Sequence, residues 1–135
     1  MATYNKFDSF VEAVCEKAHN LGSDAITVAL CAAANAPVAA NAVLTDLTVA
    51  SVANLDDVTP TISSSSQTTG TYSLVLTDLV MTASGDVGPF RYVVLYNDTA
   101  ANDELICWYD YGEDITLHAP DSFTLDFGAT LFTLA

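Results

Sequence analysis

Basic side chains are scarce in this sequence. Lys6, Lys17 and Arg91 are the only three, against 17 acidic residues, so the formal net charge is −14. Proteins that bind nucleic acids need clustered lysines and arginines to displace the counterions of the phosphate backbone. A carboxylate-rich surface is also repelled by anionic membranes. The composition therefore argues against nucleic acids and membranes as partners, and favours cations or proteins with neutral or basic patches.

Long apolar runs are missing as well. Although 51% of the residues are hydrophobic, no stretch approaches the roughly 18 apolar residues that a membrane-spanning helix requires. The start, MATYNKFDSF, has one lysine and no apolar segment typical of a secretory signal. With 15% charged residues in a chain of 135, the sequence predicts a single folded domain, 1–135, with one modest core.

Few cysteines and histidines are present to supply nucleophiles or metal ligands. Cys15, Cys31 and Cys107 stand among apolar residues without CxxC spacing, so we expect buried free thiols in a reducing compartment. His19 and His118 are not accompanied by a GxSxG nucleophile elbow, and we expect them at the surface or at a cap. A glycine-rich phosphate loop is also absent. The sequence therefore predicts no catalytic residues, no cofactor and no enzymatic activity.

Acidic side chains gather in predicted turns, where solvated carboxylates are common. The turn 97–104, NDTAANDE, is the one place where several oxygen ligands suit a hard cation such as calcium. Its candidate ligands are Asp98, Asp103 and Glu104, but the EF-hand spacing D-x-[DN]-x-[DN]-G is absent. We therefore predict no metal site, and keep calcium at this turn as an alternative.

Apolar residues at helical spacing near the N-terminus predict an amphipathic helix over residues 4–20. Phe7, Phe10 and Val14 repeat at the i, i+3 and i+7 positions that share one helix face, so we assign them to the core. Gly22 is placed to end the helix, since glycine readily adopts the left-handed conformation found there.

The middle of the chain is less regular. Residues 24–33 predict a strand, and 43–53 fit either a short helix or a strand. The serine-rich stretch 63–71 predicts a hairpin loop or a mobile loop. Alternating apolar residues over 71–84 predict a strand, and the alternation slips near Asp78, which indicates a bulge or bend.

Two apolar segments, 90–97 and 104–111, flank a polar turn and predict a central β-hairpin. We pair them so that Asn97 faces Glu104. This register places Arg91 opposite Asp110, where the opposite charges form a structural ion pair or, alternatively, Arg91 contacts a neighbouring subunit. One face of this hairpin then carries the predicted core residues Val93, Leu95, Ile106 and Trp108.

A second hairpin is predicted from 114–118 and 122–126, with Phe123 and Leu125 in the core. This hairpin is polar on one face, whereas the central hairpin is apolar on both.

These elements predict a mainly β fold with an N-terminal α-helix, which places the chain in the α+β class. The expected architecture is an antiparallel β-sandwich of hairpins over 24–135, with one amphipathic helix, 4–20, packed on it. The central hairpin needs cover on both faces, so we expect the helix on one side and a second sheet on the other.

Four stretches of the chain resemble a family of short structural proteins of tailed bacteriophages. They are ATYNKFDSFVE, TASGDVGPFRYVVLYND, WYDYGEDITL and SFTLDFGATLFTLA, and the resemblance covers both ends and the middle of the chain, apart from about residues 30–70. The segment VANLDDVTPTISSSS departs from the family pattern, because the resemblance implies a more glycine-rich stretch at this position.

The resemblance implies a capsid decoration, or cement, protein that binds the exterior of the assembled capsid. The implied partners are the major capsid protein and further copies of this chain, for example in a trimer, assembled in the bacterial cytoplasm and located in the virion. We expect contacts through 54–70, 97–104 or either terminus. A tail or head–tail connector component is the alternative. A small glycan-binding domain, which would need exposed tyrosines or paired acids in a cleft, is the second alternative.

Overall fold

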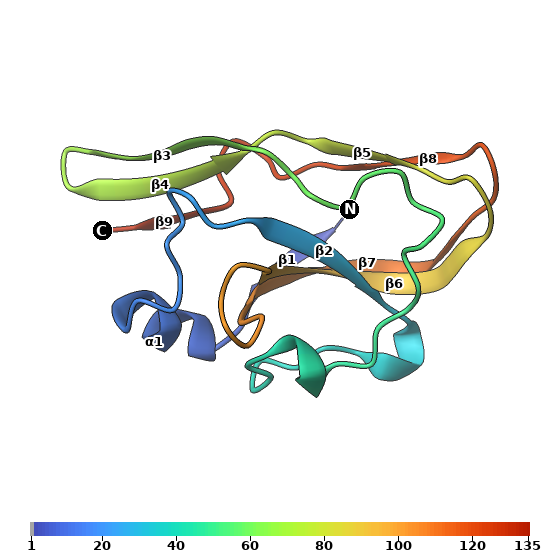
Figure 1. The fold of residues 1–135 in the computed structure, drawn as a ribbon, viewed down its shortest axis with the longest axis horizontal. Helices are drawn as coiled ribbons and strands as arrows, with labels where there is room; N and C mark the ends of the chain where they lie inside the picture. Colours follow the sequence, from blue (N-terminus) through green and yellow to red (C-terminus); the bar gives the residue numbers. More distant parts are fainter. Residues whose placement is uncertain (1) are drawn as a thin grey trace.

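A computed structural model describes residues 2–135, and these form antiparallel β-sheets with one α-helix (Figure 1). The predicted mainly β, α+β class is therefore confirmed. None of the helices in this part of the chain is both long and apolar enough to cross a membrane. The elements are β1 Thr3–Lys6, α1 Ser9–Cys15, β2 Ile26–Cys31, the 3-10 turns η1 Ala33–Asn35 and η2 Leu44–Asp46, β3 Ile62–Thr68, β4 Thr71–Leu76, β5 Leu79–Thr82, β6 Val87–Asn97, β7 Leu105–Leu117, β8 Ser122–Leu125 and β9 Phe132–Leu134.

The strands form two layers (Figure 1). One layer is a four-stranded sheet in the order β1-β7-β6-β2, and the other contains the β3-β4-β9 and β5-β8 sheets. Side chains from both layers meet in an inner core, as in other β-sandwiches. This inner core includes Val28, Leu30, Leu74, Met81, Phe90, Val93, Leu95, Ile106, Leu125 and Phe127, with Phe10 buried beside them and Val14 and Phe123 partly buried against it.

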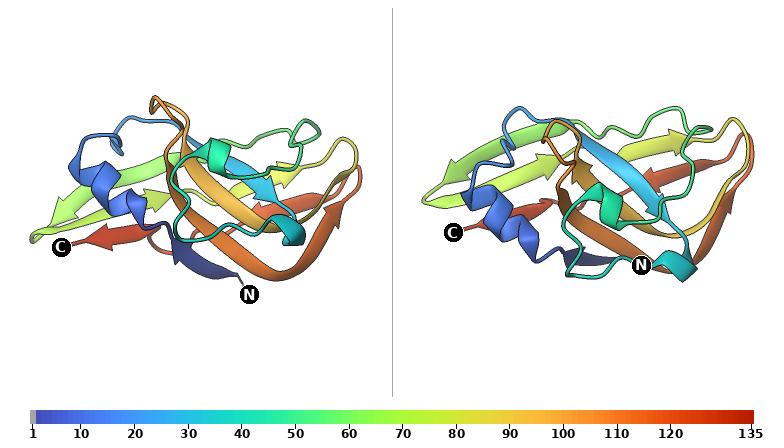
Figure 2. Two further views of the ribbon diagram at one scale, coloured as in Figure 1. Left: turned by 90° about the horizontal axis from the view of Figure 1, so that it is seen from below. Right: turned by 60° about the horizontal axis from the view of Figure 1, so that its bottom comes forward.

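The outer face of the four-stranded sheet has a smaller core of its own. Phe7 is fully buried there against Trp108, with their ring centroids 4.5 Å apart. Leu44 and Leu47, from the segment that carries η2, cover this cluster (Figure 2). The β6–β7 pair is therefore buried on both faces, as its apolar sequence predicts. The expectation that the helix covers one of these faces is wrong, because the outer face is covered by Phe7 and the η2 segment, whereas α1 packs beside the inner core.

The predicted register of the β6–β7 hairpin is wrong by one residue over most of its length. Leu95 lies opposite Cys107 instead of Ile106, because a bulge follows Leu95. At the turn the predicted pairing holds, since the Asn97 N–H donates to the Glu104 carbonyl at 2.9 Å. A one-residue slip exchanges the two faces of a strand. The four predicted core residues are all buried, but Trp108 lies on the outer face and the other three in the inner core.

The predicted helix 4–20 is also wrong in extent. Residues Thr3–Lys6 form β1, because the free edge of β7 offers hydrogen bonds that outweigh the helical spacing of the side chains. The helix α1 ends at Cys15, and Lys17 adopts a left-handed φ of 69°, so the chain turns well before Gly22. This early end leaves Cys15 exposed, which corrects the expectation that all three thiols are buried.

The serine-rich stretch forms a strand and not the predicted loop. β3 pairs with β4 up to Thr68 opposite Thr71, and the turn is only Thr69 and Gly70. Serine has little intrinsic preference for a strand, but backbone pairing with the apolar β4 overrides that preference. The predicted break near Asp78 is present, since β4 ends at Leu76 and β5 begins at Leu79.

The predicted hairpin between 114–118 and 122–126 does not form. The end of β7 stays paired with β6, where Phe90 faces Ile115, whereas β8 pairs with β5 in the other layer. The short link between β7 and β8 therefore crosses from one sheet to the other. Both segments still bury apolar side chains, but they do so from opposite sides of the inner core.

Candidate functional site: the open side of the sandwich

The two layers are left open along one side of the molecule. Strand β1 is an edge of the four-stranded sheet and β9 is an edge of the β3-β4-β9 sheet. The side chains of β1, α1 and the β8–β9 segment line two neighbouring hollows. We call this region the open side, and its two hollows the tyrosine groove and the apolar groove.

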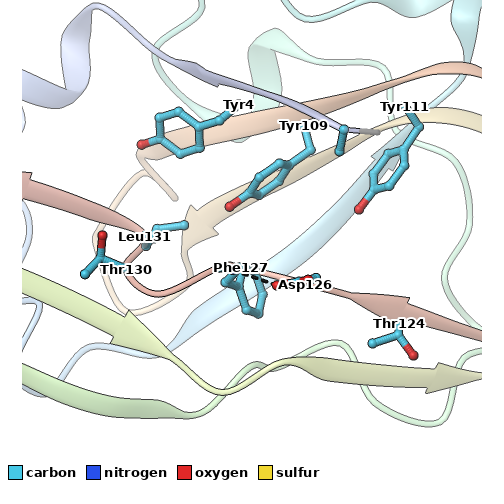
Figure 3. A pocket seen from close by; sticks show the side chains of 10 residues that line it. Tyr4, Tyr109, Tyr111, Thr124, Asp126, Phe127, Thr130 and Leu131 are labelled. Carbon is cyan, nitrogen blue, oxygen red and sulfur yellow. Dashed lines mark hydrogen bonds between the residues drawn. The ribbon is translucent and has the colours of Figure 1, made fainter.

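The tyrosine groove has a volume of about 360 Å³. Tyr109 and Tyr111 share one face of β7, because side chains alternate along a strand, and Tyr4 lies directly opposite Tyr109 on β1. Tyr4 and Tyr109 pack edge to face with their ring centroids 5.6 Å apart. The three rings lie in a row along the groove, as Figure 3 shows. The opposite wall carries Thr124, Asp126, Phe127, Gly128, Thr130 and Leu131.

Burial keeps the hydroxyls of this groove protonated. Desolvation raises the pKa of Tyr111 to about 12, and it raises the pKa values of Tyr4 and Tyr109 further. Cys107, beneath Tyr4, is fully buried, and the same desolvation raises the pKa of its thiol. At neutral pH the tyrosines therefore offer ring faces and hydrogen-bond donors, whereas the Cys107 thiolate needed for nucleophilic attack is strongly disfavoured.

The apolar groove lies between β1, α1 and β9 and has a volume of about 370 Å³. A third hollow of about 610 Å³ continues it, and we include it in the apolar groove because the two share Val14, Phe132 and Leu134. The floor is aromatic, with Phe10 and Phe132 packed edge to face at 5.1 Å. The remaining lining residues are Tyr4, Lys6, Val11, Cys15, Lys17, His19, Asn20, Leu21, Gly22, Ser65, Tyr72 and Thr133.

The charge of the apolar groove is opposite to that of the chain. Its lining contains two of the three cations, Lys6 and Lys17, and none of the acidic residues. Several of its apolar side chains are exposed: Val11 is 50% exposed and Leu134 is 53% exposed. Apolar side chains grouped at the surface mark sites of contact with another molecule.

A buried polar cluster holds the end of this groove in place. The Asn97 side-chain amide lies 3.0 Å from Nδ1 of His19 and donates to Asp24 Oδ2 at 2.7 Å. Since the amide nitrogen is a donor, Nδ1 of His19 accepts and the ring hydrogen sits on Nε2. Burial lowers the pKa of His19, which keeps the ring neutral at pH 7. His19 is 7% exposed, which corrects its expected surface position.

The candidate calcium ligands of the turn 97–104 are not brought together by the structure. Among residues 2–135 no group of three or more histidine, cysteine or acidic side chains is arranged to hold a metal ion, and this includes Asp98, Asp103 and Glu104. Glu104 Oε1 instead accepts a hydrogen bond from the Asn102 N–H at 3.0 Å. The Glu104 carboxylate therefore accepts a hydrogen bond from the backbone of its own turn.

Arg91 and Asp110 form an ion pair outside the grooves. The guanidinium donates to both carboxylate oxygens, at 2.8 Å from Nε and 3.2 Å from Nη2. The pair forms despite the register error because a second bulge, between Phe90 and Tyr92, lies at Arg91. The hydrogen bond from Arg91, followed by that from the Gly112 N–H, holds the pKa of Asp110 below its usual range. Both side chains are about one-third exposed, so the pair is a surface feature of the central strands.

The tyrosine groove is not among the sites predicted from the sequence; Tyr109 is itself 6% exposed and part of the inner core, and Tyr4 and Tyr111 flank it along the groove. The available signal was the Tyr109-x-Tyr111 spacing, which puts two tyrosines on one strand face, but Tyr4 was placed in a helix. His118 lies far from His19 and pairs with Asp86, at 2.7 Å from Nδ1 to Oδ1.

No protein-family model, curated protein or solved structure matches this chain. Ring faces, protonated hydroxyls, two lysines and free strand edges suit the binding of another molecule.

Proposed function

We propose that this protein is a non-enzymatic structural component of a tailed-bacteriophage virion, which binds the exterior of the assembled capsid as a cement protein. The observation that carries the proposal is the open side, where two strand edges and an apolar groove free of carboxylates interrupt an otherwise acidic surface. The resemblance of its N-terminal, central and C-terminal stretches to phage structural proteins supports the same function.

In the proposed mechanism, binding of this protein is coupled to assembly of the capsid. A protein that binds the assembled lattice and not the free subunits stabilises the lattice by mass action. The doubly buried β6–β7 pair provides a rigid base, while the open side, the segment 54–70 that contains β3 and the turn 97–104 provide contact surfaces. The proposed partners are the major capsid protein and further copies of this chain.

Cryo-electron microscopy of intact virions tests this proposal. We expect density for this chain on the capsid exterior, at junctions between capsid subunits. Density confined to the tail or the portal vertex would contradict a cement role and favour a tail or connector component. Absence from the particle would overturn both. A second readout is the melting of capsids that lack this protein, which adding it back should raise.

A small glycan-binding domain is the second candidate, and the tyrosine groove favours it. Tyr4 is 37% exposed, and its ring and those of Tyr109 and Tyr111 lie in a row with hydroxyl and carboxylate groups on the facing wall. Such a groove suits the stacking and hydrogen bonding of a sugar. A glycan array measures this directly. If the chain binds a glycan, we expect Tyr111→Ala to abolish the binding. Tyr96→Ala, which changes a tyrosine outside the groove, should retain it.

A further inference from the structure

We propose that His19 is an acid-sensitive switch: its neutral ring holds the turn 97–104 on the segment 18–25, and protonation of the ring releases the turn while the sandwich stays folded. The two stretches meet through residues 19, 24 and 25 on one side and residues 97–100 on the other, and we call this contact the His19 junction. The turn is one of the contact surfaces proposed above, but the inference concerns the isolated chain and does not depend on that role.

The Asn97 side chain is the centre of the His19 junction, and it is fully buried. Its amide nitrogen donates to Asp24 Oδ2 at 2.7 Å and lies 3.0 Å from Nδ1 of His19. Its amide oxygen accepts from the N–H groups of Thr99 and Ala100, both at 3.0 Å. One amide therefore ties the backbone of the turn to two side chains of the segment 18–25.

A proton on Nδ1 of His19 is incompatible with this arrangement. Nδ1 accepts the Asn97 hydrogen only while it carries no hydrogen itself, and a protonated ring donates from both nitrogens. Two donors then face each other at 3.0 Å. Turning the Asn97 amide over does not relieve this, because its oxygen would leave two backbone N–H groups and would face the Asp24 carboxylate. The Asn97 amide therefore fits only the neutral ring.

The other ring nitrogen adds to the cost of protonation. Nε2 of His19 is buried and has no hydrogen-bond partner among residues 2–135. The ring packs against Phe10 of α1, with the two ring centroids 5.2 Å apart. A buried N–H group without a partner is costly, and more so when the group carries a charge. Protonation therefore makes the ring unfavourable at both nitrogens.

The charged groups around His19 act in both directions. Asp24, from the segment 18–25, and Glu104, at the end of the turn, favour the charged ring. Lys17 lines the same hollow as His19 and opposes it, because like charges repel. From β4, Tyr72 also lines this hollow, with its hydroxyl 2.7 Å from Ser65 Oγ. Burial outweighs the two carboxylates and lowers the pKa of His19, so the junction holds the ring neutral.

Release of the turn should be local, because few other hydrogen bonds hold it on the segment 18–25. Within residues 2–135 the remaining ones are two at Ala25: the Asp98 N–H donates to the Ala25 carbonyl at 2.9 Å, and the Ala25 N–H donates to Thr99 Oγ1 at 2.8 Å. All three residues are exposed. Exposed hydrogen bonds outside a packed core open at low free energy, whereas the β6–β7 strands are buried on both faces. The turn should therefore open before the sandwich unfolds.

Amide hydrogen exchange of the purified full chain, followed by nuclear magnetic resonance, tests the proposal. Rates measured over a series from about pH 7.5 to about pH 4.5 are converted to protection factors, which removes the intrinsic effect of pH on exchange. We expect protection of the Asp98, Thr99 and Ala100 amides to fall in acid, because the released ring binds the proton more readily than the held ring. The fall should be at most about tenfold per pH unit, between about pH 6.5 and the lowered folded-state pKa of His19. Amides within the β6–β7 pair should keep their protection.

A matched pair of variants assigns the effect to one imidazole. His19→Gln and His118→Gln each remove one histidine, and glutamine still offers Asn97 an acceptor but does not titrate in this range. The fall in protection should disappear in His19→Gln. It should persist in His118→Gln, because His118 pairs with Asp86 at the surface. Circular dichroism checks that both variants are folded.

Asp24→Asn is a second variant that does not alter the ring. The asparagine oxygen can still accept from Asn97, but one carboxylate that favours the charged ring is lost. The pKa of His19 should therefore drop further, and the fall in protection should extend to lower pH than in the natural chain. A fall that ends at the same or a higher pH would contradict the switch, even if His19→Gln does not fold.

Three other results would overturn the inference: unchanged protection of the turn in acid, an equal loss throughout β6 and β7, or the same loss in His19→Gln as in the natural chain. The first would mean that the junction tolerates the charged ring. The second would mean that acid unfolds the whole domain, and the third that another group titrates. None of them bears on capsid binding, which is measured separately.

Discussion

The central β6–β7 pair and the open side contain similar apolar residues, but these are buried in the central pair and partly exposed on the open side. Val93, Leu95 and Cys107 are completely buried, because one face of their sheet meets the second layer and the other face meets the η1–η2 segment. On the open side, Val11 on α1 and Leu134 on the edge strand β9 are half exposed. The difference lies in the neighbours that the fold supplies and not in the hydrophobicity of the residues.

This contrast separates the residues that stabilise the fold from the residues that are available for recognition. Buried apolar area contributes to the free energy of unfolding, whereas apolar area left at an edge contributes only when another molecule covers it. We therefore expect substitutions in the central pair to change stability, and matched substitutions on the open side to change association.

The same truncation in the two regions gives the largest expected contrast. Leu95→Ala empties space in the inner core and should lower the free energy of unfolding by about 2–5 kcal/mol. Leu134→Ala removes a side chain that is already 53% exposed, and should cost less than about 1 kcal/mol. Urea denaturation followed by tryptophan fluorescence measures both. Similar losses for the two variants would mean that β9 is as important to folding as the central strands.

Two glycines extend the contrast to the backbone. Gly88 in β6 has a φ of +100°, and an added Cβ would lie 2.6 Å from the Ile115 carbonyl oxygen. Gly88→Ala should therefore cost about 2–3 kcal/mol from backbone strain and collision with β7. Gly128, beside the tyrosine groove, has a φ of +71° and open space around it, so Gly128→Ala should cost about 1 kcal/mol. Thermal denaturation compares them, and a larger loss for Gly128→Ala would contradict this order.

The two histidines should give stability opposite dependences on pH. Burial lowers the pKa of His19, so the unfolded chain binds the proton more readily and stability falls as the pH drops below about 6.5. The hydrogen bond to Asp86 raises the pKa of His118, so its contribution is complete below about pH 6.5 and is lost as the pH rises through the folded-state pKa. His118 is exposed, so its contribution should be the smaller one.

Nuclear magnetic resonance titration of both imidazoles measures these shifts. We expect Asp86→Asn to return the pKa of His118 towards its ordinary value and to leave that of His19 unchanged. A His19 whose pKa lies above its ordinary value would show that the Glu104 and Asp24 carboxylates outweigh burial.

The smallest expected effect belongs to the Arg91–Asp110 pair. The Arg91 hydrogen bonds lower the pKa of Asp110, so the contribution of the pair is present above about pH 4 and is lost as the pH falls through the folded-state pKa. Arg91→Gln should raise the pKa of Asp110, which carboxyl-carbon chemical shifts would report. An unchanged pKa would assign the shift to the Gly112 N–H instead.

The fold was predicted correctly where the pattern of apolar side chains determines the structure. It was predicted wrongly where the structure depends on which strands pair. The class, the central β6–β7 pair and the break near Asp78 follow from local patterns of apolar residues. The extent of the N-terminal helix, the serine-rich strand and the partner of β8 depend on which strand edge is free. The one-residue error in the β6–β7 register came from a bulge, which leaves no clear mark in an apolar sequence.

The candidate site was less accessible to prediction than the fold. The charge imbalance and the Arg91–Asp110 pairing were readable from the sequence. The grooves were not, because each combines residues from both ends of the chain, such as Tyr4 with Leu131 and Phe10 with Phe132.

The sequence by itself determined a mainly β protein with a strongly negative charge and a doubly apolar central hairpin, because composition and alternation act locally and need no knowledge of distant partners. Only the tertiary structure decided which strands became edges, which tyrosines faced solvent and where the two lysines gathered. Those outcomes depend on contacts between residues far apart along the chain, and they are also the features that create a surface for binding.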